Sequence, residues 1–561
     1  MNYTSSINTH LILPELVQLI WVSGLLGFAL CFYHVKTVNT NRSLQNLKYL
    51  NTDPSLGEAV DQTTKQTTSV KNTVHVNTEA ETLVPSAHRV ASLIYPMMQT
   101  EPCVRLMILG LLCSAYIYSQ TGLSHALAFD TLIWDPLSRT MTILLCISGA
   151  CALCLGTQSF KRLSRYEFII LLWLSMLGNL CLIKSYNFLA FYLSVELQSL
   201  SFYMLAAMRS RTEASAEAGL KYFILSAFSS AILLLGMALI YGSIGSQSFA
   251  DLAITLNHFN TVPGYATSGL IVGIGCITIS LLFKLGAAPF HAWIADVYEG
   301  SNTSITAWFA ITAKFGVVTV LIRNLINVSG DNFWTLLAFV AAISLLVGSL
   351  SAMRQIKLKR LIAFSGVANV GWFLCALIAG QWQMLILHLI VYTLLSISLF
   401  CAFITPLFRT HPDLSYRQRF TKGQVNHSAD SLSVKYISDL HQISNVNPSF
   451  AFAIACALFS LAGIPPYAGF YSKYLIINAL TQSELYGILT LALGSAVISA
   501  FYYVRVINAM YFARLPQKGK AQWWFTIHEI PANCALLAWT SAATVLFFLK
   551  PDYVFVWLAA I

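Results

Sequence analysis

Apolar residues fill long stretches of this chain in runs of about 20 positions, without the strict alternation of a half-buried strand. A helix needs about 20 residues to cross the hydrocarbon core of a bilayer. The pattern therefore predicts an all-α polytopic membrane protein with about 14 transmembrane helices, rather than a barrel. We place these helices near residues 11–33, 103–121, 136–157, 166–184, 187–208, 217–243, 268–295, 303–325, 333–352, 361–380, 383–406, 449–479, 485–513 and 532–555.

Composition and charge agree with this class. Of the 561 residues, 57% are hydrophobic and 10% are charged, whereas soluble domains carry about 25% charged residues. The formal net charge of +10 comes from Lys and Arg in short loop clusters, which indicates orientation in a membrane rather than binding to nucleic acid. Among the 12 cysteines, Cys151 and Cys154 form a CxxC inside a predicted helix. We interpret them as packing residues, not as a metal or redox site.

The basic residues also test the number of helices. When the connections are taken alternately, about 23 Lys and Arg fall on one side and about one, Lys184, falls on the other. The positive-inside rule then places the basic side in the matrix or cytoplasm and both termini on the opposite side. The basic connections are residues 34–102, 158–165, 209–216, 296–302, 353–360, 407–448 and 514–531.

Two of these connections are long and polar, residues 34–102 and 407–448. We interpret them as loosely packed loops, with a defined binding role as the alternative. The expected organisation is a first transmembrane helix (1–33), a polar insert (34–102), helices 2 and 3 (103–165), a five-helix repeat (166–325), a second five-helix repeat with the polar loop (333–513), and helix 14 with the C-terminus (514–561).

Prolines interrupt two predicted helices, the seventh and the twelfth. Pro289 has no N–H, so one carbonyl of the preceding turn loses its helical partner. Pro465 and Pro466 have the same effect in the twelfth helix. The carbonyls freed there belong to Leu461 and Ala462. Because the breaks lie five helices apart and five is odd, helices 4–8 and 9–13 are expected to form two inverted repeats, as in transporters that carry discontinuous helices.

Charged side chains lie inside several predicted helices, where each costs about 2.5–3.5 kcal/mol or more at the bilayer centre. Lysine suits proton transfer because a buried amine can become neutral, whereas arginine stays charged. We predict that these residues pass protons and that the glutamate pairs with a lysine of a neighbouring helix; the alternative is a static ion pair that fixes helix packing. The residues are Glu196, Lys221, Lys284, Lys314 and Lys473.

Two histidines also lie in predicted spans. His291 follows Pro289 between Lys284 and Lys314, and its side chain can relay protons at physiological pH. A packing histidine is the alternative reading of His291. For His388 the relay role and the packing role are left equally open.

The motifs around these residues resemble a known family, the antiporter-like subunits of proton-pumping NADH:quinone oxidoreductase (respiratory complex I), and among them the N-type, or chain 2, group. The stretches that carry the resemblance are VELQSLSFYMLAA, EAGLKYFILSAFSS, FKLGAAPFHAWIADVYEG, AGIPPYAGFYSKY and AFYYVRVI. The resemblance covers about residues 11–33 and 103–555. Residues 301–304 depart from it, because they read SNTS where the family often has APTP.

The resemblance implies roles for single residues. Glu196 and Lys284 would be the pair on helices 5 and 7, Lys221 the lysine of helix 6, Lys314 the central lysine of helix 8, and Lys473 the lysine of helix 12 near the outer exit. It also implies a proton-translocating subunit of NADH:ubiquinone reductase whose partners are the lipid bilayer and other membrane-arm subunits, above all neighbouring antiporter-like ones.

We expect no cofactor and no metal in this chain, because the sequence has no Walker loop, ferredoxin-like spacing or dinucleotide fingerprint. FMN, iron–sulphur clusters and ubiquinone are expected in other subunits, and bound lipids around this one. The expected location is the mitochondrial inner membrane, with both termini in the intermembrane space. Two alternatives stay open: a subunit of a multisubunit Na⁺/H⁺ antiporter, and a non-pumping structural membrane subunit.

Overall fold

The computed structural model describes residues 100–120, 126–128, 131–163, 166–209, 212–259, 266–326, 331–404, 407–410, 434–441, 443–513, 524–527 and 531–551. The predicted helix at 11–33 and the polar insert lie outside the described residues, apart from residues 100–102, which are helical. Most of the polar loop 407–448 lies outside them as well.

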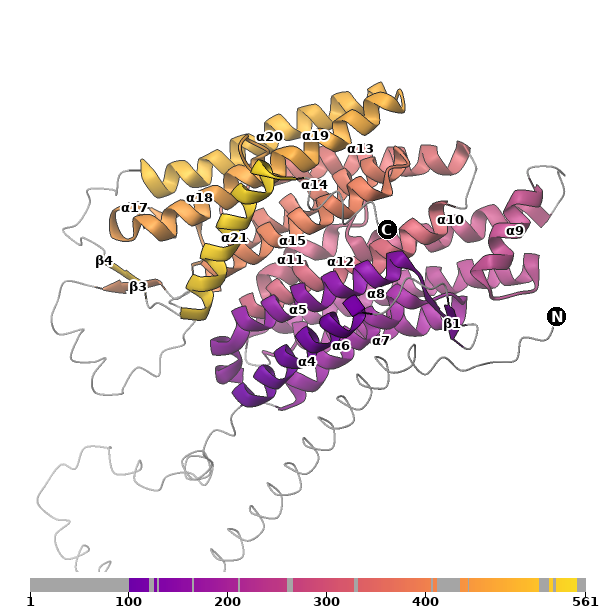
Figure 1. The fold of residues 1–561 in the computed structure, drawn as a ribbon, viewed down its shortest axis with the longest axis horizontal. Coiled ribbons are helices and arrows are strands. Elements are labelled where there is room, and N and C mark those ends of the chain that lie inside the picture. The colour runs from indigo at the N-terminus through magenta and orange to yellow at the C-terminus, as the bar shows by residue number, and fades with distance from the viewer. Residues whose placement is uncertain are drawn as a thin grey trace, which may run out of the picture.

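Helices dominate the described chain, which confirms the all-α prediction (Figure 1). The first half contains α4 (Thr100–Gln120), α5 (Pro136–Leu163), α6 (Tyr166–Lys184), α7 (Phe188–Ala206), α8 (Glu213–Ile244), α9 (Phe249–Phe259), α10 (Ala266–Leu285), α11 (Ala292–Gly300) and α12 (Thr303–Ile326). The second half contains α13 (Asp331–Met353), α14 (Leu358–Ile378), α15 (Trp382–Ile404), the 3₁₀ turn η3 (Ile437–Leu440), α17 (Ile443–Val446), α18 (Pro448–Ala462), α19 (Ala468–Gln482), α20 (Tyr486–Tyr511) and α21 (Pro531–Leu549).

Within the described ranges, 10 helices are long and apolar enough to cross a membrane. Three shorter apolar helices, Gly269–Leu285, Pro448–Ala462 and Asn533–Leu549, fall in the predicted spans 268–295, 449–479 and 532–555. The first two are the predicted discontinuous helices, which the structure divides into α10 with α11 and α18 with α19. Each half thus ends in a broken helix followed by one long helix, α12 or α20, as expected of two five-helix repeats.

The two halves lie side by side, the first in indigo to pink and the second in orange to yellow (Figure 1). They meet where α12 packs against α15 and α11 packs against α14. Of the spanning window of α12, 94% is buried inside the protein, compared with 28% for α8 and for α20. Because so little of α8 and α20 is covered, these two helices have most of their surface available to lipid or to partner chains.

Sequence reasoning missed several short elements. The helix α9 lies in the connection before α10, and two antiparallel pairs of strands join loop segments. In the first, β1 (Ala126–Ala128) pairs with β2 (Leu132–Trp134), with Leu127 opposite Ile133. In the second, β3 (Leu407–Thr410) pairs with β4 (Trp524–Ile527), which joins two connections of the predicted basic side. Strands of three or four residues are too short to give a recognisable sequence pattern.

Candidate functional site

The break between α10 and α11 is built by glycine and proline together. The N–H groups of Gly286 and Ala287 both donate to the carbonyl of Leu282, at 3.0 and 2.9 Å, and this ends α10. Gly286 has a φ of +77°, a conformation that residues with a Cβ rarely adopt. Pro289 adds no N–H to the connection. As a result Lys284 lies in the last turn of α10, beside the break that the sequence predicts.

Lys284 is partly buried. Its Nζ donates to Ser226 Oγ of α8 at 3.0 Å. Glu196 of α7 does not form the direct ion pair with Lys284 that the sequence led us to expect. Instead, its Oε2 accepts from Ser199 Oγ at 3.4 Å, and its buried Oε1 has no hydrogen-bond partner among the described residues. Hydroxyl groups stand between the two charged groups, and this is the physical reason for the difference.

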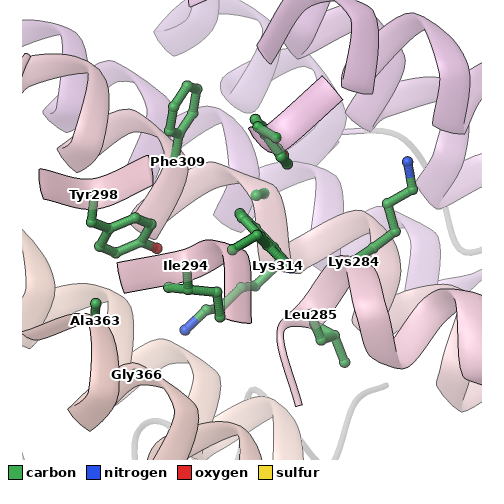
Figure 2. Close-up of a pocket in the computed structure, with 11 residues that line it drawn as sticks. Lys284, Leu285, Ile294, Tyr298, Phe309, Lys314, Ala363 and Gly366 are labelled. Atoms are coloured by element: carbon green, nitrogen blue, oxygen red, sulfur yellow. The ribbon is translucent and has the colours of Figure 1, made fainter. Parts of the chain in front are cut away.

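A small cavity is lined by both Lys284 and Lys314 of α12 (Figure 2). It offers about 20 Å³ of space for the centres of water molecules, and about 10–15 Å³ suffices for one water. Figure 2 shows the two lysine side chains extending in opposite directions, with Lys314 pointing towards Gly366 of α14. A Cβ at Gly366 would lie 3.4 Å from the Tyr392 hydroxyl and 4.0 Å from Lys314 Nζ, which are ordinary van der Waals contacts.

Lys314 is 6% exposed and is surrounded by rings rather than by carboxylates. Its Nζ lies 3.7 Å from the centroid of the Tyr392 ring and 5.7 Å from that of Phe373. In the part of the chain that the structure describes, no carboxylate forms an ion pair with it. A charge on Lys314 is therefore offset by the faces of aromatic rings, which attract a cation when it is desolvated.

The second break holds Lys473 of α19, which is also 6% exposed. Its Nζ donates to the carbonyls of Leu461, at 2.7 Å, and Ala462, at 3.4 Å. These are the carbonyls that Pro465 and Pro466 leave without helical partners, as predicted. The lysine thus replaces the missing N–H groups and is fixed at the end of α18 by the break itself.

His388 of α15 lies near Lys473 of the same half and is linked through Phe373 to Lys314 of the first half. It is 3% exposed, and its Nδ1 lies 3.1 Å from Ser472 Oγ, next to Lys473. Its ring meets Phe373 edge to face, with centroids 5.2 Å apart. Phe373 therefore contacts both Lys314 and His388, and these residues form a line of contacts that ends at Ser472, the residue before Lys473.

Two sequence candidates lie off this line. Lys221 has a side chain that is 43% exposed and pairs with Glu217 at 2.6 Å and with Asp296 at 2.8 Å. It lies two turns from the start of α8, in a helix long enough to span a membrane, and its role in proton transfer stays a prediction. His291 precedes α11 and meets Phe364 edge to face, with ring centroids 6.2 Å apart. It does not belong to the lining of the cavity between Lys284 and Lys314.

Sequence reasoning also missed an ion-pair network at one end of the bundle. Asp296 of α11 accepts from Arg360 Nη2 of α14 at 2.9 Å as well as from Lys221. Glu299 pairs with Arg360 and with Lys357. The network joins α8, α11 and α14, and so ties the second part of the broken helix to the other half of the protein. The charged DVYEG and KLKR stretches were its only sequence signal.

No group of three His, Cys, Asp or Glu that could hold a metal ion occurs in the described ranges.

Comparisons with known proteins bear on this arrangement. Residues 185–499 match the family described as NADH:quinone oxidoreductase/Mrp antiporter, TM. The chain is 37% identical to NADH-ubiquinone oxidoreductase chain 2 of Oenothera berteroana, over 74% of this chain and 80% of the relative. It is 36% identical to NADH-quinone oxidoreductase subunit N 1 of Rhizobium meliloti, over 67% of this chain and 75% of the relative.

Solved structures share the fold. A chain of respiratory complex I from Thermus thermophilus is similar with a TM-score of 0.67 and 26% identity, over 84% of this chain and 96% of that one. A chain of the Mrp complex from Dietzia sp. has a TM-score of 0.66 and 16% identity, over 82% and 90%. At that identity the second likeness concerns the fold alone.

Proposed function

The chain belongs to the NADH:quinone oxidoreductase/Mrp antiporter family, among its chain 2 and subunit N members, and we propose that it moves protons through the membrane arm of complex I along Glu196, Lys284, Lys314, His388 and Lys473. One observation carries the proposal. Both helix breaks hold a lysine, and a cavity and an aromatic contact connect the two breaks through Lys314. A merely structural ion pair needs no such continuity.

The contacts of each residue support its part in this function. Glu196 offers Lys284 a carboxylate through hydroxyl groups, so that it stabilises the protonated amine. The cavity allows water to pass a proton from Lys284 to Lys314. Lys473 binds a proton at the second break, and hydrogen bonds to two backbone carbonyls stabilise the protonated amine. Protons enter from the basic side, load Lys284 and Lys314, and leave beyond Lys473.

The chain is a multi-pass membrane protein that associates with other membrane subunits, as do similar chains in multisubunit complexes. Within the proposal, its partners are neighbouring antiporter-like subunits, and FMN, iron–sulphur clusters and ubiquinone belong to other chains. The membrane is the mitochondrial inner membrane, with the basic connections in the matrix and both termini in the intermembrane space. The identity with plant chain 2 and the alternation of basic residues support this location.

Extraction in mild detergent tests whether the chain belongs to complex I or to a free-standing antiporter. The native membranes are solubilised in mild detergent, resolved on a native gel and examined by mass spectrometry. We expect this chain to migrate with flavin, iron–sulphur clusters and NADH dehydrogenase activity. A small assembly without redox cofactors would instead identify a subunit of a free-standing antiporter.

The pair at the first break is tested by Lys284→Ala and Glu196→Ala. We expect each to slow proton translocation by about tenfold, a loss of about 1.4 kcal/mol of transition-state stabilisation. NADH:quinone turnover should fall by less, because electron transfer takes place on other subunits. Assembly should survive, because both groups are linked through hydroxyls rather than through a direct ion pair. Ser280→Ala is the matched control, since Ser280 is buried one turn earlier on α10 and its hydroxyl has no partner in the described chain. Full pumping in an assembled Lys284→Ala complex would exclude the proposed role.

A further inference from the structure

Three side-chain hydroxyls lie between the carboxylate of Glu196 and the amine of Lys284. Ser199 Oγ donates to the Glu196 backbone carbonyl at 3.1 Å and to Glu196 Oε2 at 3.4 Å, and Ser199 is a neighbour of the Tyr203 phenol one turn later on α7. The Tyr203 hydroxyl donates to Ser226 Oγ at 2.5 Å, and Lys284 Nζ donates to the same oxygen at 3.0 Å. The acid on α7 and the base at the end of α10 are therefore connected by hydroxyl groups of α7 and α8.

Packing holds these hydroxyls in place. Ser226 is fully buried and Tyr203 is 6% exposed. The Tyr203 ring stands edge-on to the rings of Tyr222 and Phe223, with centroids 4.9 and 5.6 Å apart. The hydroxyls consequently have little freedom to move apart and almost no contact with bulk solvent.

The approach of α8 to α7 depends on a small residue. A Cβ at Gly219 would lie 2.6 Å from the Cβ of Ala207, the residue that caps α7. Only glycine allows the two helices to come this close at their junction. The contact keeps Tyr203 and Ser226 on facing sides of the two helices, within hydrogen-bond distance of each other.

Ser226 differs from its neighbour on the same helix. The Ser229 hydroxyl, one turn later, donates to the backbone carbonyl of Ser226 at 2.8 Å, which is the usual way a helix satisfies a serine. The Ser226 hydroxyl instead receives two side-chain donors, one from Tyr203 and one from Lys284. The Ser226 hydroxyl therefore links the tyrosine and the lysine through two hydrogen bonds.

We propose that Tyr203 and Ser226 carry the proton that Glu196 and Lys284 exchange, an inference that rests on the proposed function. When neutral Lys284 takes a proton, the Ser226 O–H bond breaks and an N–H bond forms on the amine. Ser226 regains a proton from Tyr203, and Tyr203 regains one from the Glu196 carboxyl group through Ser199. Glu196 becomes a carboxylate, Lys284 becomes an ammonium group, and each hydroxyl ends with one proton, because a hydroxyl both donates and accepts.

The experiment uses the whole complex reconstituted in sealed vesicles. Ser226→Ala and Tyr203→Phe each remove one oxygen atom and leave the surrounding rings in place. We expect each to slow proton translocation by about tenfold at unchanged assembly, a loss of about 1.4 kcal/mol. The double variant should be no slower than the slower single variant. Both hydroxyls belong to the same proton-transfer series, so removing the second one has no further effect once the first is gone. Ser229→Ala, whose hydroxyl donates to a backbone carbonyl and to no side chain among the described residues, should pump like the unaltered complex.

The outcomes separate this inference from the proposed function. Wild-type translocation in both single variants, or losses that multiply in the double variant, would overturn the hydroxyl connection. Lys284→Ala is measured in the same vesicles. If Lys284→Ala is slow while Ser226→Ala and Tyr203→Phe are not, only the hydroxyl connection is wrong. If Lys284→Ala also pumps normally, the proposed function itself fails.

Discussion

Replacing Lys314 by methionine is expected to slow proton passage through this chain by about 10²–10⁴-fold, the usual cost of losing a positioned proton donor. Lys314 connects the cavity at the first break to the aromatic contact that leads to the second. Methionine has a similar shape and no ionisable group, so the ring faces of Tyr392 and Phe373 remain packed. The measurement is the rate of acidification of sealed vesicles at saturating NADH and quinone.

Lys314→Arg is the matched control for charge. Arginine keeps the positive charge over the Tyr392 ring but does not release its proton in proteins. We expect the arginine variant to assemble and to be as slow as the methionine variant. Rapid proton passage in Lys314→Arg would show that Lys314 acts only through its charge, and it would remove Lys314 from the proton path.

Gly469→Val is expected to prevent assembly of the complex. Gly469 lies in α19, and a Cβ there would overlap the carbonyl oxygen of Ser460 in α18 and lie 2.6 Å from its carbon. The backbone of Gly469 also donates to Ser460 Oγ at 3.0 Å, so both parts of the broken helix would have to move apart. Overpacking costs about 1–3 kcal/mol, occasionally more, and here the obstacle is backbone rather than a flexible side chain.

Gly494→Ala is the control for this prediction, since a Cβ at Gly494 in α20 meets nothing within 4 Å. Native gels of membranes should show the intact complex with Gly494→Ala and little or none with Gly469→Val. Normal amounts of complex with Gly469→Val would contradict the close approach of α18 and α19.

The helix breaks could be predicted from sequence because their causes are local. Proline has no N–H wherever it stands, so Pro465 and Pro466 identify the carbonyls of Leu461 and Ala462 without any knowledge of the fold. The cost of burying an amine makes Lys473 a candidate in the same way. The structure joins the two observations, because Lys473 donates to those two carbonyls.

The contacts between helices could not be predicted, because they depend on which faces meet. Serine and tyrosine are common in these helices, so nothing in the sequence distinguishes Ser226 from Ser229. The same limit explains Lys221, whose partner Asp296 lies 75 residues away on α11. A charge in an apolar run indicates burial only when the run is central to the membrane, and Lys221 lies near the start of a 32-residue helix.

The number of protons moved per pair of electrons tests the central claim most directly. It is measured in sealed vesicles that contain the assembled complex, for the unaltered chain and for the double variant Lys284→Ala, Lys314→Met. Electron transfer takes place on other subunits in this account, so NADH oxidation should persist when a protonophore removes the gradient. The account predicts a lower proton-to-electron ratio in the double variant. An unchanged ratio would contradict proton transfer through this chain.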